Sequence, residues 1–375
     1  MKIIFLIRSL NPGGAERQLV NLAISLKDKG YKISVCIYYP GGSLENELRQ
    51  NNVEIYYLEK KSRWNILSFF LSLIRFIRKE KPDIIYAYLS TANVISVLLK
   101  PIFKNVRVIW GIRASNMDLS QYDRIWQFSY FLERKLSRFS DLIIVNSYAG
   151  MTDSEKNGFQ KEKMVVIHNG IDTTKFNYQP QLRQKIRKEW NIEDHEILIG
   201  LVARLDPKKD HQNFIIASSI LAKEWKNIKF ICIGRGDKNK LNHLKRLSME
   251  NGLYKQLLWA GPRTDMPAVY NGLDILCMSS SFGEGFPNVI GEAMACGLPC
   301  VATDVGDSAL IVCDIGIIVP PNQPQKLAEG LLKMIAKIEN NKTAISKQAR
   351  QFIIDMYKTE KMVSHTESVL NEIVQ

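Results

Sequence analysis

Strands and helices alternate from the first residue onward, and this order constrains the fold more than any other feature. An apolar strand over 2–7 leads into the glycine-rich turn 11–14. The next segment keeps its leucines on one helical face and ends at Gly30, a typical helix terminus, before a second apolar strand over 33–38. This β-α-β unit predicts an α/β domain with a parallel, doubly wound sheet.

The same alternation restarts after a polar, basic stretch near 177–190. From 197 to 303, five apolar strands alternate with four helical segments. A chain of 375 residues is also too long for one ordinary core. We therefore predict two α/β domains, over 1–177 and 178–354, and a last helix, at about 355–375, that crosses back to the first domain.

Composition is that of a globular protein, and the net charge of +13 is concentrated in one half. Residues 1–177 contain 26 basic and 16 acidic side chains, whereas the remainder contains 25 and 22. The basic half predicts a polyanionic partner, either an anionic membrane or a nucleic acid. No motif for nucleic-acid recognition occurs, so a nucleic-acid partner is not expected.

Neither the cysteines nor the N-terminus indicates export. The six cysteines include no Cys-x-x-Cys pair, so we expect buried thiols in a reducing cytoplasm. Five apolar residues before Arg8 are too few for a signal peptide, and no apolar run approaches the roughly 20 residues that span a bilayer. We predict a cytoplasmic protein, peripheral on the inner face of the cell membrane.

Residues 60–81 carry the feature that favours a membrane surface. They contain seven basic side chains and one acid, Glu80, around a very apolar stretch. A helix of this kind can lie on an anionic membrane. A helix that packs into the core and has basic ends explains the same pattern, and we expect about half of its apolar surface to face inward.

A helix predicted over 288–296 begins directly after a glycine-rich loop. Pro287 suits its first helical position, and Gly297 suits its end. The free amide groups at the start of such a helix form an anion site, which Gly283 and Gly285 open to a ligand.

Two glutamates belong to this segment. Glu284 stands beside the predicted anion site, where a carboxylate is unexpected unless a hydroxyl-rich group needs an acceptor. Glu292, about two turns beyond Glu284, can reach a second pair of hydroxyl groups such as those of a ribose. An ordinary capped helix with a surface glutamate is the alternative.

A basic loop follows the strand predicted over 197–202. Arg204 lies at the carboxyl end of that strand, where open α/β sheets bind ligands, and together with Lys209 it can clamp a diphosphate. A solvated basic loop is the alternative. Gly234-Arg235-Gly236-Asp237 closes the next strand as an incomplete dinucleotide fingerprint, which is a weak signal.

The order of several motifs resembles the retaining GT-B glycosyltransferases called glycosyl transferases group 1, of the family 4 type. The resemblance covers nearly the whole chain and is densest over 198–330. Its motifs are Gly13-Gly14-Ala15-Glu16, Asn169-Gly170-Ile171-Asp172, Arg204 with Lys209, Gly261-Pro262-Arg263, Glu284 with Glu292-Ala293-Met294-Ala295, and Ala302-Thr303-Asp304-Val305-Gly306. It implies two Rossmann-like doubly wound domains that face a cleft.

The resemblance also implies a role for each matching residue. Arg204 and Lys209 would hold the donor diphosphate, and Glu284 would face the donor sugar as the third catalytic residue. Glu292 would accept hydrogen bonds from the ribose. The other donor-binding residues that we expect are Gly13, Gly14, Glu16, Arg113, Gly234, Arg263, Gly285, Phe286 and Asn288.

The sequence departs from the family in one respect. Many relatives carry a functional His after a middle strand of the first domain, whereas the first His here is His168. The segment 110–116 takes that place, so Arg113 or Asn116 is expected to contact the donor sugar or the acceptor.

We expect neither a metal nor a cofactor. No Asp-x-Asp motif occurs, and the five His residues lack the spacing of metal ligands. Arg204, Lys209 and a helix N-terminus would then stabilise the charge on the leaving diphosphate.

The function predicted is transfer of a sugar from a nucleotide diphosphate donor, a UDP-sugar, with retention at the anomeric carbon. The acceptor would be a glycan, lipid-linked, in the synthesis of capsule, O-antigen or a similar surface polysaccharide. A nucleotide-sugar epimerase on the same fold is the alternative. The missing Gly-x-Gly-x-x-Gly argues against a second alternative, a redox protein of the Rossmann type.

Overall fold

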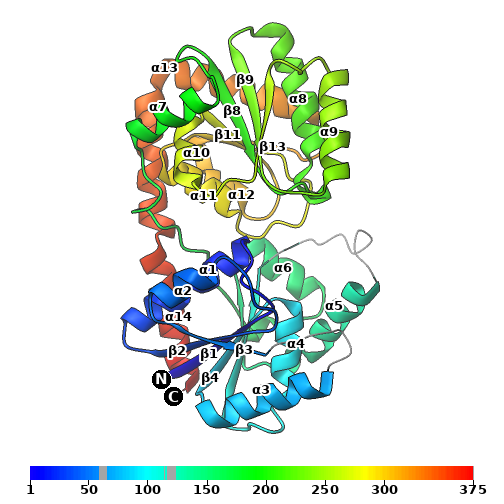
Figure 1. Cartoon of the computed structure of the whole chain (residues 1–375), viewed down its shortest axis with the longest axis vertical. Helices are drawn as coiled ribbons and strands as arrows, with labels where there is room; N and C mark the ends of the chain where they lie inside the picture. The colour runs from blue at the N-terminus through cyan, green and yellow to red at the C-terminus, as the bar shows by residue number, and fades with distance from the viewer. Residues whose placement is uncertain (59–65, 114, 116–123, 375) are drawn as a thin grey trace. The chain divides into compact units, whose positions relative to one another are not determined.

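The computed structural model of the chain describes residues 1–58, 66–113, 115 and 124–374. It divides into two compact units, one formed by Met1–Gly170 with Thr359–Gln375, the other by Ile171–Lys358. Each unit is a parallel sheet with helices on both faces (Figure 1). Lys60, Lys61, Arg63 and Asn116, which the sequence analysis singled out, lie outside the described residues.

The first unit contains a seven-stranded sheet in the order β3-β2-β1-β4-β5-β6-β7, and all its pairs are parallel. The strands are β1 (Lys2–Ile7), β2 (Lys32–Ile37), β3 (Glu54–Tyr57), β4 (Ile84–Tyr88), β5 (Arg107–Ile112), β6 (Leu142–Val145) and β7 (Met164–Val166). The helices are α1 (Gly14–Asp28), α2 (Glu45–Gln50), α3 (Ile66–Glu80), α4 (Ser90–Leu98), α5 (Arg124–Leu136), α6 (Tyr148–Lys156) and α14 (Thr359–Val374), with short 3₁₀ turns at η2 (Ser137–Phe139) and η3 (Lys161–Lys163).

Two apolar clusters cover the two faces of this sheet. One joins the sheet to α1, α2 and α14, and the other joins it to α3 and α4 (Figure 1). The apolar side of α3 faces inward, because Phe69, Leu73, Phe76 and Ile77 are buried. Among the described residues, no helix is long and apolar enough to cross a bilayer.

The second unit contains a six-stranded parallel sheet in the order β10-β9-β8-β11-β12-β13. The strands are β8 (Ile197–Val202), β9 (Ile228–Ile233), β10 (Leu257–Gly261), β11 (Ile275–Met278), β12 (Cys300–Thr303) and β13 (Ile317–Val319). The helices are α7 (Pro180–Glu189), α8 (His211–Glu224), α9 (Lys238–Glu250), α10 (Met266–Gly272), α11 (Asn288–Ala295), α12 (Ser308–Val312) and α13 (Pro324–Tyr357), with 3₁₀ turns η4 (Pro207–Lys209) and η5 (Cys313–Ile315).

The division between the units falls after Gly170 rather than at 177, and the return falls at Thr359 rather than 355. Gly170 belongs to the first unit because its amide and carbonyl exchange two hydrogen bonds of 2.9 Å with the Gln18 side chain. Ile171 instead packs into the core of the second unit and donates its amide to the carbonyl of Tyr357, at 2.7 Å. The last helix is α14, which belongs to the first unit.

Three sequence expectations need correction. The α/β pattern of the second unit starts before 197, because the polar stretch 177–190 contains α7, which buries Ile186 and Arg187. Pro287 precedes α11 with an extended ψ of 98° instead of occupying its first helical position. Cys313 is exposed, whereas the other five cysteines are buried.

Candidate functional site

Two loops of the second unit meet where its strand order reverses, between β8 and β11. Such a switch point at the carboxyl edge of a parallel sheet is where open α/β folds bind ligands. The hydroxyl of Ser279 donates to the carbonyls of Lys209 and Asp210, at 2.9 and 3.0 Å. The amide of Ser281 donates to the carbonyl of Lys208, at 2.8 Å. These bonds hold the loop after β11 against the loop after β8.

Glu284 and Lys209, predicted from separate motifs, form an ion pair at this junction. The carboxylate is 7% exposed and also accepts a hydrogen bond of 2.7 Å from the hydroxyl of Ser280. Burial by itself would raise the pKa of Glu284, but the Lys209 and Lys208 ammonium groups hold that pKa below its usual range. An ammonium group has three donors, so Lys209 keeps donors for a second anion.

Two further cations lie on the loop after β8. Arg204 is exposed, and among the ion pairs of the described residues none includes it. Lys208, which the sequence analysis did not select, places its ammonium 3.4 Å from the carbonyl of Gly283. Burial lowers the pKa of Lys208 even though Glu284 opposes this shift. Lys208 and Lys209 act on Glu284 from the loop after β8, and Asp206 on the same loop partly offsets their charge at Lys208.

Glycines shape two neighbouring loops of this edge, the loop that leads into α11 and the loop after β12. Gly283 and Gly306 adopt the left-handed region, with φ of +74° and +65°. A Cβ on Gly306 would overlap the carbonyl oxygen of Gly285, which accepts a hydrogen bond of 2.9 Å from the amide of Asp307. Only glycine permits this close approach of the two loops.

The remaining predicted residues of this loop and of α11 divide into backbone and side-chain roles. Phe286 is 4% exposed and packs its ring against Tyr357, with centroids 5.1 Å apart, so its side chain belongs to the core. Asn288 is the first residue of α11. Further along the helix, Glu292 accepts a hydrogen bond of 2.7 Å from the hydroxyl of Tyr270. Burial, then the charge of Glu292, raises the pKa of Tyr270, so this phenol remains a donor.

Gly234 and Arg263 have contacts of their own in the second unit. A Cβ on Gly234 would overlap the carbonyl of Ala203, so glycine lets the loop after β9 approach the loop after β8. Arg263 forms two hydrogen bonds with the carboxylate of Asp265, at 2.9 and 2.7 Å, and an ion pair with Glu189. Hydrogen bonds to Asp265 and then Glu189 raise the pKa of Arg263.

The predicted residues of the first unit also lie at the carboxyl edge of its sheet. Gly13 and Gly14 begin α1, and the carboxylate of Glu16 lies so close to Gly13 that a Cβ there would overlap it. Arg113 follows β5 and stacks over the ring of Tyr88, 4.5 Å from its centroid. Its guanidinium donates to the hydroxyl of Tyr86 at 3.0 Å and to the side-chain carbonyl of Asn169 at 3.3 Å.

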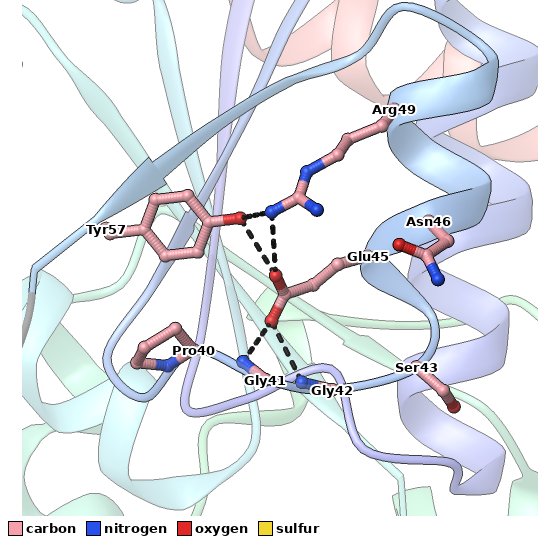
Figure 2. Close-up of a pocket in the computed structure, with 8 residues that line it drawn as sticks. All are labelled: Pro40, Gly41, Gly42, Ser43, Glu45, Asn46, Arg49 and Tyr57. Atoms are coloured by element: carbon pink, nitrogen blue, oxygen red, sulfur yellow. Dashed lines mark hydrogen bonds and ion pairs between the residues drawn. The ribbon is translucent and has the colours of Figure 1, made fainter.

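A hollow of about 480 Å³, formed by the loop after β2, by α2 and by Tyr57 of β3, was not predicted from the sequence (Figure 2). Its centre is the buried carboxylate of Glu45, which accepts from the amides of Gly41 and Gly42 at 2.7 and 2.9 Å. The hydroxyl of Tyr57 and the guanidinium of Arg49 donate to its other oxygen, at 2.8 and 3.3 Å. The dipeptide Gly41-Gly42 shortly before a glutamate is the sequence signal that could have indicated this loop.

In the part of the chain that the structure describes, no three His, Cys, Asp or Glu side chains gather as metal ligands. The junction of the second unit brings cationic side chains and the buried carboxylate of Glu284 together at a glycine-lined edge of the sheet. Such a junction can bind and stabilise a leaving anion while the carboxylate accepts from hydroxyl groups.

Comparison with known proteins gives matches to both units. Residues 12–175 match the family described as "Glycosyltransferase Family 4", and residues 183–352 match "Glycosyl transferases group 1". Together these matches include the glycine-rich loop of the first unit and the cationic junction of the second.

Curated relatives align over most of the chain. It is 27% identical to a Campylobacter jejuni protein named "GalNAc-alpha-(1->4)-GalNAc-alpha-(1->3)-diNAcBac-PP-undecaprenol alpha-1,4-N-acetyl-D-galactosaminyltransferase". That alignment of 303 residues covers 78% of this chain and 77% of the Campylobacter jejuni protein. It is 22% identical over 314 residues to the Escherichia coli "UDP-Gal:alpha-D-GlcNAc-diphosphoundecaprenol alpha-1,3-galactosyltransferase", covering 81% and 79%.

Solved structures extend the likeness to the whole fold. The crystal structure of Anabaena HepE in complex with UDP-glucose matches with a TM-score of 0.87, covering 99% of this chain and 100% of that chain. Sequence identity in this match is 24%, so it establishes a common architecture of two units.

Proposed function

The chain belongs to the group 1, family 4 type glycosyltransferases with the GT-B fold, and from this premise we propose that it transfers a sugar from a UDP-sugar to a glycan with retention. The observation that carries the proposal is the junction of Arg204, Lys208 and Lys209 with Glu284. Its three cationic side chains can donate to the diphosphate of a nucleotide-sugar, and its carboxylate suits a sugar hydroxyl.

In the reaction, the bond between the anomeric carbon and the diphosphate oxygen breaks while a bond to the acceptor oxygen forms on the same face. The acceptor hydroxyl gives its proton to the departing phosphate oxygen. Arg204 and Lys209 stabilise the negative charge that develops on the diphosphate, because fixed cations in a site of low dielectric act most strongly where charge appears. The chain's own cations supply this stabilisation, and no metal is part of the proposal.

The other residues of the second unit orient the donor. Glu284 accepts from a hydroxyl of the donor sugar, and the amides of Gly285, Phe286 and Asn288 face the sugar and its phosphates. Glu292, oriented by the hydroxyl of Tyr270, accepts from the ribose. Gly234 lets the backbone approach the nucleotide, and Arg263 lines the base while its guanidinium remains bound to Asp265.

The first unit contributes the Gly13-Gly14 loop, Glu16 and Arg113 to the sugar and acceptor side. The names of the two curated relatives include glycans linked to undecaprenol. These names support a lipid-linked acceptor and a role in the synthesis of a surface polysaccharide. We also propose that the protein is cytoplasmic and binds the inner face of the cell membrane, where such an acceptor is presented. Its basic first half supports this association.

A thermal-shift panel of UDP-, GDP- and ADP-sugars tests the donor. We expect UDP-sugars to raise the melting temperature of the wild type and of Lys223→Ala, which removes an exposed cation at the far end of α8. Arg204→Ala should lose most of this shift. Stabilisation by NAD, or by GDP- or ADP-sugars alone, would contradict the UDP assignment. Conversion of free UDP-sugar to its epimer without any acceptor would contradict transfer.

A further inference from the structure

The exposed phenylalanines of the protein gather on one short segment. Of its 15 phenylalanines, all of them among the described residues, three are exposed: Phe128, Phe131 and Phe139, at 60%, 45% and 48%. Phe128 and Phe131 lie three residues apart on α5, which Figure 1 labels, and hence on one side of that helix. Phe139 ends η2, which directly follows α5 in the sequence. Large aromatic side chains exposed in a cluster mark an interaction surface more often than chance.

Cations accompany these rings. The guanidinium of Arg134 and the ammonium of Lys135 lie 5.5 and 5.9 Å from the centre of the Phe131 ring. The guanidinium of Arg138 lies 5.0 Å from the centre of the Phe139 ring. We call these six residues, Phe128, Phe131, Phe139, Arg134, Lys135 and Arg138, the α5 surface.

No carboxylate opposes these cations on α5. The sequence from 124 to 140 contains one acid, Glu133. Its side chain points inward, because it is 4% exposed and accepts a hydrogen bond of 2.6 Å from Asn93 on α4. The outward side of the helix therefore presents aromatic rings and positive charge together.

The neighbouring segment extends the surface. The Lys100 ammonium donates to the carbonyl of Phe139, at 3.0 Å, which ties the turn after α4 to η2. That segment exposes Leu98 and Ile102, at 48% and 47%, together with Lys104. In contrast, the described part of α3 buries most of its apolar side chains and exposes one large one, Leu71, at 44%.

We propose that the α5 surface docks on a bilayer of anionic phospholipids. Aromatic rings at the level of the headgroups, with arginine and lysine at their edges, combine apolar burial with electrostatic attraction. A second copy of this chain is disfavoured as the occupant, because two such surfaces would bring like charges together. The inference deepens the proposed function, since it names the surface that would bring the enzyme to a lipid-linked acceptor.

Vesicle sedimentation with the full chain tests the proposal. The wild type should pellet with vesicles of phosphatidylglycerol and phosphatidylcholine but not with phosphatidylcholine alone. Two triple variants should each lower the vesicle partition constant at least about tenfold, equivalent to roughly 1.4 kcal/mol: Phe128→Ser with Phe131→Ser and Phe139→Ser, and Arg134→Glu with Lys135→Glu and Arg138→Glu.

Two matched controls locate the effect. Removing three exposed apolar side chains of the second unit, by Met249→Ser, Tyr254→Ser and Leu310→Ser, should leave binding unchanged. The same change of net charge on α3, by Arg75→Glu, Arg78→Glu and Lys79→Glu, should lower binding much less than the α5 reversal. The proposal is overturned if the α3 reversal has the larger effect, if the serine triple binds like the wild type, or if the wild type never pellets.

The vesicle experiment can fail without affecting the proposed transferase function, because donor binding is measured independently. The UDP-sugar thermal shift should be the same in all four variants, because none of them changes the second unit's cationic junction. Loss of that shift in the wild type would refute the donor assignment and leave the vesicle result standing. If light scattering shows that the serine triple converts a dimer to a monomer without changing vesicle binding, the α5 surface is a contact between copies and the proposal is wrong.

Discussion

Glu284 and Glu45 are two buried carboxylates with contrasting surroundings. Each lies in a loop or helix start beyond a strand of a parallel sheet, and each is less than 10% exposed. The two carboxylate oxygens of Glu45 accept hydrogen bonds from four donors that line the hollow, and the Arg49 guanidinium balances the negative charge. Glu284 is held by Lys209 and Lys208, whose ammonium groups keep further donors, and the exposed Arg204 lies on the same loop.

This difference separates a structural carboxylate from one placed for chemistry. A buried charge whose hydrogen bonds are all satisfied holds its loop and has little left for a ligand. A buried carboxylate that is paired with an ammonium group leaves the remaining donors of that group for an incoming anion. The four predictions below test this distinction, from the largest expected effect to the smallest.

The largest effect is expected at the cationic junction. Lys209→Ala and Arg204→Ala should each reduce transferase turnover by about 10²–10³-fold, because each removes about 2.7–4 kcal/mol of stabilisation from the leaving diphosphate. Initial rates with a UDP-sugar donor measure the loss, and Lys223→Ala is the matched control. Lys209→Ala also leaves Glu284 without its ion pair, so Arg204→Ala, which removes an exposed side chain, is the cleaner variant. Turnover near that of the wild type in both would refute the assignment.

Glu45→Ala should reduce stability rather than donor binding. It removes the acceptor for two glycine amides and a tyrosine hydroxyl, and a hydrogen bond to a charged group contributes about 1.5–3 kcal/mol. Denaturant unfolding should show a lower midpoint, while the thermal shift caused by a UDP-sugar should persist. Arg49→Ala, which truncates a half-exposed partner, should cost only about 0–1 kcal/mol. A normal midpoint in Glu45→Ala would show that the hollow is not held by this carboxylate.

Replacing Glu284 should change how the free energy of unfolding depends on pH, and we expect this effect to be smaller than that of Glu45→Ala. Its folded-state pKa is lowered, so its charged form stabilises the folded protein at neutral pH. That contribution is fully present above the unfolded pKa, about 4.3, and disappears as the pH falls through the lower folded value. Glu284→Gln should therefore be less stable than the wild type at neutral pH, and the two should converge in acid. Parallel curves for the two proteins would contradict the shift.

The sequence was sufficient for elements whose ends are set by backbone chemistry. Gly297 ends α11 with φ of +75°, as its position predicted. It was insufficient where burial decides: α7 reads as a polar stretch because the residue it buries beside Ile186 is Arg187, whose guanidinium bonds Asp274 at 2.9 Å. A buried ion pair between segments 87 residues apart leaves no periodic signal.

The candidate site divides in the same way. Lys209 and Glu284 were predicted from separate motifs, and the structure joins them because parallel strands bring their carboxyl ends to one edge. Lys208 was passed over because neighbouring lysines cannot be ranked without knowing which carbonyl each meets. The burial of Phe286 and of Glu45 could not be predicted either, because the local sequence does not indicate which loop side chains are covered by other segments.

The smallest effect is expected from removing divalent ions. If the cations of the junction balance the leaving diphosphate, turnover with a UDP-sugar should be unchanged after treatment with EDTA. The expectation follows from the positive charge already fixed beside Glu284 by Lys208 and Lys209, with Arg204 on the same loop. Initial rates of sugar transfer are measured before EDTA treatment, after it, and again after Mg²⁺ or Mn²⁺ is added back. Complete loss of activity that either ion restores would mean that three side-chain cations do not suffice, and the contrast between Glu284 and Glu45 would then need a metal to explain it.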